Sequence, residues 1–279
     1  MKVTPALKIG ILISLSLISI VALGMWLYQG YLDNVHNRYY PLNLKRLDSL
    51  AERLKTKLNA ISKPVSLEGG GHQFSAMPAD IKYLNFYLPK FIFELSKYPP
   101  EVISKLGLKE VIIGSDTELD HHPRAAINSH YLHMLFFDCR WVNADRWTRQ
   151  IIHHELFHLI DWKDCIIHKD PEWEKLNPSD FKYGSGGISL QKPSDWSAGL
   201  PDTSLKGFLN HYSMSGLEED KAEIFAHMMV NYKAIDSRAE TDPIIKAKMS
   251  QMKKLLYDFC PAFNKDFWSK LKAVPVPSE

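Results

Sequence analysis

The sequence predicts an α+β protein that is mostly helical, with a small sheet beside a helix at 143–164 and one apolar helix ahead of the domain. Apolar residues recur at helical spacing in most segments. Two short apolar runs, 109–114 and 131–137, are typical of strands. Residues 9–28 form an uncharged apolar run at the N-terminus. The 279 residues suffice for one sizeable domain with accessory segments.

The composition is that of a globular protein, with 45% hydrophobic and 24% charged residues. A formal net charge of +2 gives no electrostatic footprint for nucleic acid, so we expect no nucleic-acid partner. Cys139, Cys165 and Cys260 allow one disulfide at most, and their spacing is not that of a zinc knuckle or ribbon. We interpret them as small core residues.

Residues 9–28 predict an uncleaved membrane anchor, because about 20 apolar residues span a bilayer as a helix. A signal peptide has a shorter apolar region of about 7–15 residues; cleavage and secretion are the alternative. Lys2 and Lys8 place the N-terminus in the cytoplasm and the remainder of the chain outside it. The expected divisions are residues 1–31 (N-terminus and anchor), 32–78 (juxtamembrane helix and glycine-rich loop), 79–272 (main domain) and 273–279 (tail).

The other elements follow from periodicity and from turn residues. Residues 40–61 place leucines at helical spacing between charged residues, as in an amphipathic stalk or packing helix. Gly69 to Gly71 predict a flexible loop. In the loop at 115–129, His121 and His122 are better interpreted as solvated side chains than as a second metal site. The remaining expectations are helices at 79–97, 101–106, 215–233, 243–259 and 262–271, and a long connection at 163–208.

The helix at 143–164 contains the H-E-x-x-H motif His154-Glu155-Leu-Phe-His158. Positions i and i+4 share one helix face, so His154 and His158 can bind one ion. Glu155 lies about 100° around the helix, which places its carboxylate beside the ion rather than on it. Two imidazoles suit zinc, and the carboxylate suits a general base. A motif this short also arises by chance, so the prediction needs further ligands.

A catalytic zinc needs three protein ligands and an open position. Glu219 and Glu223 lie at i and i+4 in the helix expected at 215–233. One carboxylate can bind zinc while the other orients a ligand histidine, an arrangement common in metal sites. Spacing alone leaves open which does which, or whether both are solvated.

These residues resemble a known family. His154-Glu-Leu-Phe-His158 followed by Glu219-x-x-Ala-Glu223 is similar to the gluzincin metallopeptidases. The pattern most closely resembles the group that holds the anthrax lethal factor catalytic domain, the Pro-Pro endopeptidases and related bacterial zinc-binding metallopeptidases. In that group a catalytic Tyr lies seven residues before the metal-binding Glu, as Tyr212 does here (219 − 212 = 7). The resemblance therefore implies Glu219 as the third zinc ligand, Glu223 as its supporting carboxylate and Tyr212 as the transition-state stabiliser.

The resemblance covers roughly residues 80–235 and includes Trp173-x-x-Leu-Asn-Pro178 and Phe181-x-Tyr183-Gly184. It implies a zinc-metallopeptidase domain with one Zn²⁺ per chain that hydrolyses peptide or protein substrates. The strand at 131–137 is then expected to be an edge strand that pairs with extended substrate. The alternative is a non-catalytic, zinc-stabilised binding or scaffold protein of the cell envelope, which would have no need of Glu155 or Tyr212.

Four other polar residues lie beside the motifs. His153, His211 and His227 are expected to support the site or to be partly buried rather than to bind metal. Asp161, three residues after His158, could accept a hydrogen bond from a ligand imidazole or lie at the helix surface.

Overall fold

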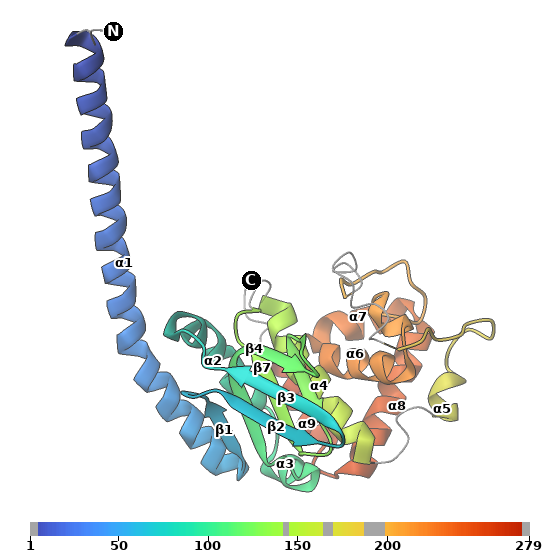
Figure 1. The fold of residues 1–279 in the computed structure, drawn as a ribbon. Coiled ribbons are helices and arrows are strands. Elements are labelled where there is room, and N and C mark those ends of the chain that lie inside the picture. Colours follow the sequence, from blue (N-terminus) through green and yellow to red (C-terminus); the bar gives the residue numbers. More distant parts are fainter. Residues whose placement is uncertain (1–4, 142–144, 164–169, 187–198, 275–279) are drawn as a thin grey trace.

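The computed structural model of the chain describes residues 5–141, 145–163, 170–186 and 199–274, with the side chains of 5–20 and 33 left out (Figure 1). Its elements confirm a mixed α+β fold in which helices predominate around a small mixed sheet. Cys139 and Cys260 are buried and free, whereas Cys165 lies outside the described residues.

Helix α1 (Pro5–Leu54) is continuous and includes both N-terminal helices expected from the sequence. Its first half stands apart from the rest of the protein, and its second half packs on the domain through Leu47, Leu50 and Leu54 (Figure 1). The helix ends at Leu54 rather than at residue 61, because residues 57–60 pair with a strand instead. Much of the expected anchor, residues 9–20, lies where side chains are not described. Among the described helical residues, none forms a stretch long and apolar enough to cross a membrane.

The sheet is built around one long strand, β4 (Glu110–Leu119). β7 (Met134–Asp138) and β1 (Lys57–Ala60) pair with it in parallel. β3 (His72–Met77) and β5 (His122–Pro123) pair with it antiparallel. β2 (Val65–Gly69) and β6 (Ala126–Ser129) complete the path β2-β3-β4-β7-β6, in which β6 is an edge strand.

Three sequence predictions fail in this region. The glycine-rich segment is the tight turn of the β2–β3 hairpin, where Gly70 and Gly71 adopt positive φ angles of 62° and 82°. Residues 115–129 are not a loop, since β4 continues to Leu119 and β5 and β6 follow. Strands β1 to β3, which lie before residue 79, also belong to the sheet, although the sequence predicted no strand there.

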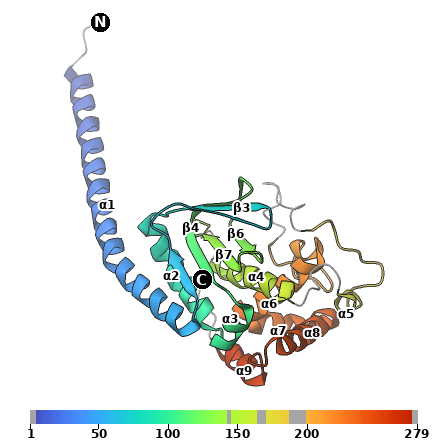
Figure 2. The ribbon, with the colours of Figure 1, turned by 60° about the horizontal axis from the view of Figure 1, so that its bottom comes forward.

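Residues 111–113 of β4 and 134–137 of β7 are buried on both faces, which explains why these two runs are apolar throughout. Val111 and Leu135 enter the main core with the helices, whereas Ile112 and Phe136 pack with Phe74 in a smaller core on the other face. The helices of the main core are α2 (Ile81–Ser96), α3 (Pro100–Leu106), α4 (Asp145–Lys163), α6 (Leu217–Val230), α7 (Tyr232–Thr241), α8 (Pro243–Phe259) and α9 (Lys265–Ala273), with the short α5 (Pro171–Glu174) at its side. Helix α4 lies between β6 and α6, and α8 lies beyond α6 (Figure 2).

Candidate metal centre

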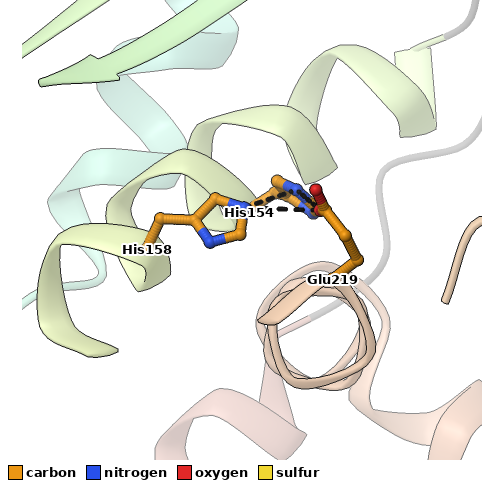
Figure 3. A group of neighbouring side chains, drawn as sticks. All are labelled: His154, His158 and Glu219. Atoms are coloured by element: carbon orange, nitrogen blue, oxygen red, sulfur yellow. Dashed lines mark hydrogen bonds and ion pairs between the residues drawn. The ribbon is translucent and has the colours of Figure 1, made fainter. Parts of the chain in front are cut away.

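Helices α4 and α6 carry the candidate site between them. α4 buries Ile152, Leu156 and Ile160 in the core, which turns the neighbouring face with His154 and His158 towards α6. α6 buries residues on almost its whole circumference, including the carboxylate-bearing Glu219. The two helices thereby bring the three predicted ligands together, although Glu219 lies 61 positions after His158 in the sequence (219 − 158 = 61) (Figure 3).

The ligand atoms converge at the spacing of one tetrahedral ion. His154 Nε2 lies 3.0 Å from His158 Nε2 and 3.0 Å from Glu219 Oε2, and His158 Nε2 lies 3.4 Å from Glu219 Oε2. Ligands about 2.0–2.1 Å from a tetrahedral zinc are roughly 3.3 Å from one another. Within the described part of the chain, this is the one group of three or more His, Cys, Asp or Glu side chains that meets within 4.8 Å.

The electrostatics of the cluster favour a bound cation. Burial opposes a charge on His154, but hydrogen bonds and charges from Glu219 and Glu223 raise the pKa of His154 well above its ordinary value. Burial likewise opposes ionisation of Glu219, yet its contacts with His154 and His158 lower the pKa of its carboxyl far below the usual range. Two imidazoles and one carboxylate of this kind fit a zinc ion with a fourth position open.

Glu223 lies on the opposite edge of the His154 ring. Its Oε1 is 3.0 Å from His154 Nδ1, and its Oε2 accepts a 2.6 Å hydrogen bond from Asn210 Nδ2. His227 Nδ1 donates to the backbone oxygen of Glu223 at 2.9 Å. A carboxylate on Nδ1 keeps the proton there and leaves the Nε2 lone pair for a metal. Glu219 therefore lies at the Nε2 edge of His154, and Glu223 lies at the Nδ1 edge of the same ring.

Glu155 is half-buried and faces β6 rather than α6. Asn128 Nδ2 on β6 donates a 2.6 Å hydrogen bond to Glu155 Oε2, which fixes one carboxylate oxygen and leaves Oε1 available. Sequence reasoning missed Asn128, because it lies in a segment expected to be a loop. A four-residue strand with two polar residues carries too little periodicity to be recognised.

Tyr212 lies beside the cluster and interacts with Glu219, in a 3₁₀ turn that precedes α6. Its ring centroid is 5.9 Å from that of His154. Burial and the charges of Glu219 and Glu155 raise the pKa of the Tyr212 phenol well above its ordinary value. The hydroxyl is therefore a hydrogen-bond donor at neutral pH, beside the position where the three ligands meet.

The strand nearest the metal helix is not the one expected. Residues 131–137 contribute β7, which is enclosed between β4 and β6 and cannot accept a further strand. The prediction of an edge strand at 131–137 is thus wrong, because the preceding strand, β6, pairs with β7 and lies at the edge of the sheet instead. Among the described strands, β6 is the one at this edge of the sheet; it contacts α4, and its Asn128 bonds Glu155.

The neighbouring polar residues have structural partners. Asp161 bonds the buried Lys221 rather than a ligand imidazole or solvent. His153 is fully buried between Tyr98 and Glu94, with contacts of 2.6 and 2.7 Å. His211 is exposed, 3.6 Å from Asp202, and both His121 and His122 are exposed as well.

Asp220, the residue after Glu219, bonds both α5 and the segment that follows it. Its Oδ2 accepts hydrogen bonds from Trp173 Nε1 at 2.8 Å and Tyr183 hydroxyl at 2.6 Å, and it pairs with Lys248 Nζ at 2.7 Å. Asp220 and Lys248 are fully buried. Sequence analysis did not detect this role, because an acidic residue in a charged run usually indicates a solvated helix face.

Comparison of the chain with protein-family models, with curated proteins and with solved structures found no match. The functional assignment therefore depends on the site itself.

Proposed function

We propose that the protein is a zinc-dependent endopeptidase of the gluzincin type. One observation carries the proposal, namely the convergence of His154 Nε2, His158 Nε2 and Glu219 Oε2 at the spacing of a tetrahedral ion. Two features beside the cluster, the Glu155 carboxylate and the Tyr212 hydroxyl, support catalysis rather than a purely structural metal. A structural zinc site is closed by four protein ligands, whereas three ligands leave room for water and substrate.

Each side chain has a distinct part in peptide hydrolysis. His154, His158 and Glu219 would hold zinc, which when bound supplies a water of lowered pKa and polarises the substrate carbonyl. Glu155 Oε1 takes the proton of the attacking water and passes it to the leaving amine. Asn128 holds Oε2, so that the carboxylate keeps one orientation through both transfers. The Tyr212 hydroxyl donates a hydrogen bond to the developing oxyanion, a contribution typically worth roughly 10²–10³ in rate.

The substrate class follows from the edge strand. Within the part of the chain that the structure describes, β6 is an edge strand in contact with α4, and an extended peptide can add to such an edge through main-chain hydrogen bonds. Asn128 marks the point on β6 that faces Glu155, so a peptide paired there would pass over the metal position. This arrangement supports cleavage within a peptide or protein chain.

The proposal includes the predicted location of the enzyme. Residues 9–28 would anchor α1 in a membrane with the N-terminus cytoplasmic and the catalytic domain extracytoplasmic, or would be removed on secretion. The support is the uncharged sequence and the continuity of α1 into the domain.

The test combines metal content with hydrolysis, measured on the purified full-length chain. Wild type should hold about one zinc after dialysis, and Glu219→Ala should lose most of it. Glu155→Gln should keep zinc but lose roughly 10²–10⁴ in hydrolysis of a peptide library, because only the base is removed. Glu240→Ala, an exposed carboxylate on α7, is the matched control and should change neither property. Zinc retained in Glu219→Ala, or full hydrolysis by Glu155→Gln, would refute the assigned roles. Zinc bound without any hydrolysis would favour the binding or scaffold alternative.

A further inference from the structure

Three aromatic rings form a stack at one end of the candidate site. The His130 ring lies between those of Trp162 and Tyr131, at centroid distances of 3.4 and 3.9 Å. The outer two rings are 6.1 Å apart. Trp162 and Tyr131 nevertheless remain 39% and 51% exposed. The stack thus presents aromatic surface to solvent although its rings pack against one another.

Trp162 is aligned with the metal ligands along α4. His154, His158 and Trp162 are successive i, i+4 positions and therefore share one helix face. The Cα of Trp162 is about 6 Å beyond that of His158 along the axis. Side chains on a helix lean towards its N-terminus, so the indole leans back towards His158. The exposed ring is the next large side chain on the face that holds the candidate metal ligands.

The stack also lies at the end of the edge strand. His130 directly follows β6, and Asn128, two residues earlier, contacts Glu155. The three rings therefore lie both at the end of β6 and one turn beyond His158 on the α4 face that carries the candidate ligands. A peptide that is paired with β6 and passes the metal position would continue along them.

The β2–β3 turn supports the stack from behind. A Cβ on Gly70 would lie 2.0 Å from the Tyr131 ring, and one on Gly69 would lie 2.7 Å from Leu132. The backbone of the turn thus packs directly on the segment that carries Tyr131, and Gly70 also needs its positive φ. Burial and neighbouring histidine charges lower the pKa of His130, so its ring is uncharged at physiological pH. The rings are held in place before any ligand arrives.

We propose that Trp162, backed by His130 and Tyr131, is a specificity subsite for an aromatic side chain of the peptide substrate. This inference rests on the proposed endopeptidase function. Along the axis of α4, the Cα of Trp162 lies about 6 Å from that of His158 and about 12 Å from that of His154. An extended peptide advances about 3.3 Å per residue, so this span corresponds to two to four residues from the scissile bond. A peptide antiparallel to β6 places the aromatic residue on the amino side of that bond.

The first test is a positional scan on the zinc-loaded full-length chain. A cleaved peptide is resynthesised with a single Phe moved through four positions on each side of the scissile bond, with Leu and Ala at the same positions for comparison. Phe two to four residues from the bond should raise kcat/KM by roughly 3- to 10-fold, the range expected for one stacked aromatic pair. Trp162→Ala should abolish the preference, whereas Trp162→Phe should keep most of it. Tyr257→Ala removes a different exposed aromatic residue, on α8, and should leave the preference intact.

A binding measurement separates failure of this inference from failure of the proposed function. The same peptides are titrated against zinc-loaded Glu155→Gln, with and without Trp162→Ala. The subsite would be overturned, and the endopeptidase left in place, by either of two outcomes. One is equal cleavage whatever the position of Phe, and the other is a kcat/KM that Trp162→Ala lowers by the same factor for every peptide. Phe-dependent binding that Trp162→Ala removes, without cleavage by wild type, would support the subsite and refute the enzyme. Neither binding nor cleavage would overturn both.

Discussion

The substitution Lys248→Met tests whether the buried Asp220–Lys248 pair stabilises α6, the helix that carries the candidate ligand Glu219. Both side chains are fully buried, and Lys248 Nζ contacts Asp220 Oδ2 and the Gly207 backbone oxygen, each at 2.7 Å. Burial lowers the pKa of Lys248 and raises that of Asp220, although each partner opposes the shift of the other. Methionine keeps the length and apolar stem of lysine but removes the countercharge.

The expected loss of stability can be derived from the charge left behind. A buried carboxylate without its partner typically costs about 3–5 kcal/mol. Asp220 can avoid this cost by binding a proton, which at pH 7 requires about 1.36 × (7 − 3.9) ≈ 4 kcal/mol from an ordinary aspartate. The unpaired charge therefore lowers the free energy of unfolding by at most about 4 kcal/mol. Loss of the hydrogen bond from Lys248 to the Gly207 carbonyl lowers it by about 1 kcal/mol or more. We expect a decrease of roughly 4–5 kcal/mol in the free energy of unfolding at pH 7.

The sign of the pH dependence follows from the same argument. In Lys248→Met the folded-state pKa of Asp220 is raised, so the loss in free energy of unfolding is largest at high pH. This loss shrinks by about 1.4 kcal/mol per pH unit as the pH falls towards 4. Urea unfolding of Lys248→Met and wild type at pH 7 and pH 5 measures both quantities. Adding Asp220→Asn should restore much of the stability, because the amide needs no countercharge.

A matched control is available at the surface. Lys272 Nζ lies 2.6 Å from Asp236 Oδ2, but the two side chains are 55% and 37% exposed. Lys272→Met should cost less than about 1 kcal/mol. A loss in Lys248→Met as small as in this control, or one that does not change with pH, would refute the assignment of a buried charge pair.

Three further predictions concern the site and its framework. Glu223→Gln keeps the shape of the side chain but weakens the acceptor at His154 Nδ1, so zinc affinity in competition with a chelating dye should fall roughly 10–100-fold. Asn128→Leu removes the donor to Glu155 Oε2, and kcat should fall about tenfold or more while KM changes little, because the β6 backbone is retained. Asp242 caps α8, and hydrogen bonds from backbone N–H groups outweigh burial and lower the pKa of its carboxyl. Its contribution to stability is present above an ordinary aspartate pKa of about 4 and is lost as the pH falls through the lower folded value, so Asp242→Asn should flatten the acid limb of the stability curve.

Each of these has an outcome that contradicts it. Unchanged zinc affinity in Glu223→Gln would mean that His154 is oriented by other contacts. A rise in KM with constant kcat in Asn128→Leu would assign Asn128 to peptide binding rather than to the base. An acid limb identical in wild type and Asp242→Asn would show that other carboxylates control acid unfolding.

The elements with long, regular periodicity were predicted closely. The helix expected at 143–164 is α4, and those at 79–97 and 243–259 are α2 and α8. Short strands failed, because β6 has four residues and its pairing with β7 is decided by segments outside it. The same limit hid the β2–β3 hairpin, whose glycines indicate a turn only when the flanking strands are recognised.

The sequence by itself determined the face of α4 on which His154 and His158 lie, because a four-residue spacing allows only one geometry on a helix. It also determined the candidate carboxylates, since Glu219 and Glu223 stand one turn apart. Only the tertiary structure decided which of the two faces the Nε2 atoms, because that choice depends on how α6 packs against α4. The packing also brought Asn128 to Glu155 and the three-ring stack to the end of β6. These contacts join segments that are far apart in the sequence, and local sequence patterns do not predict them.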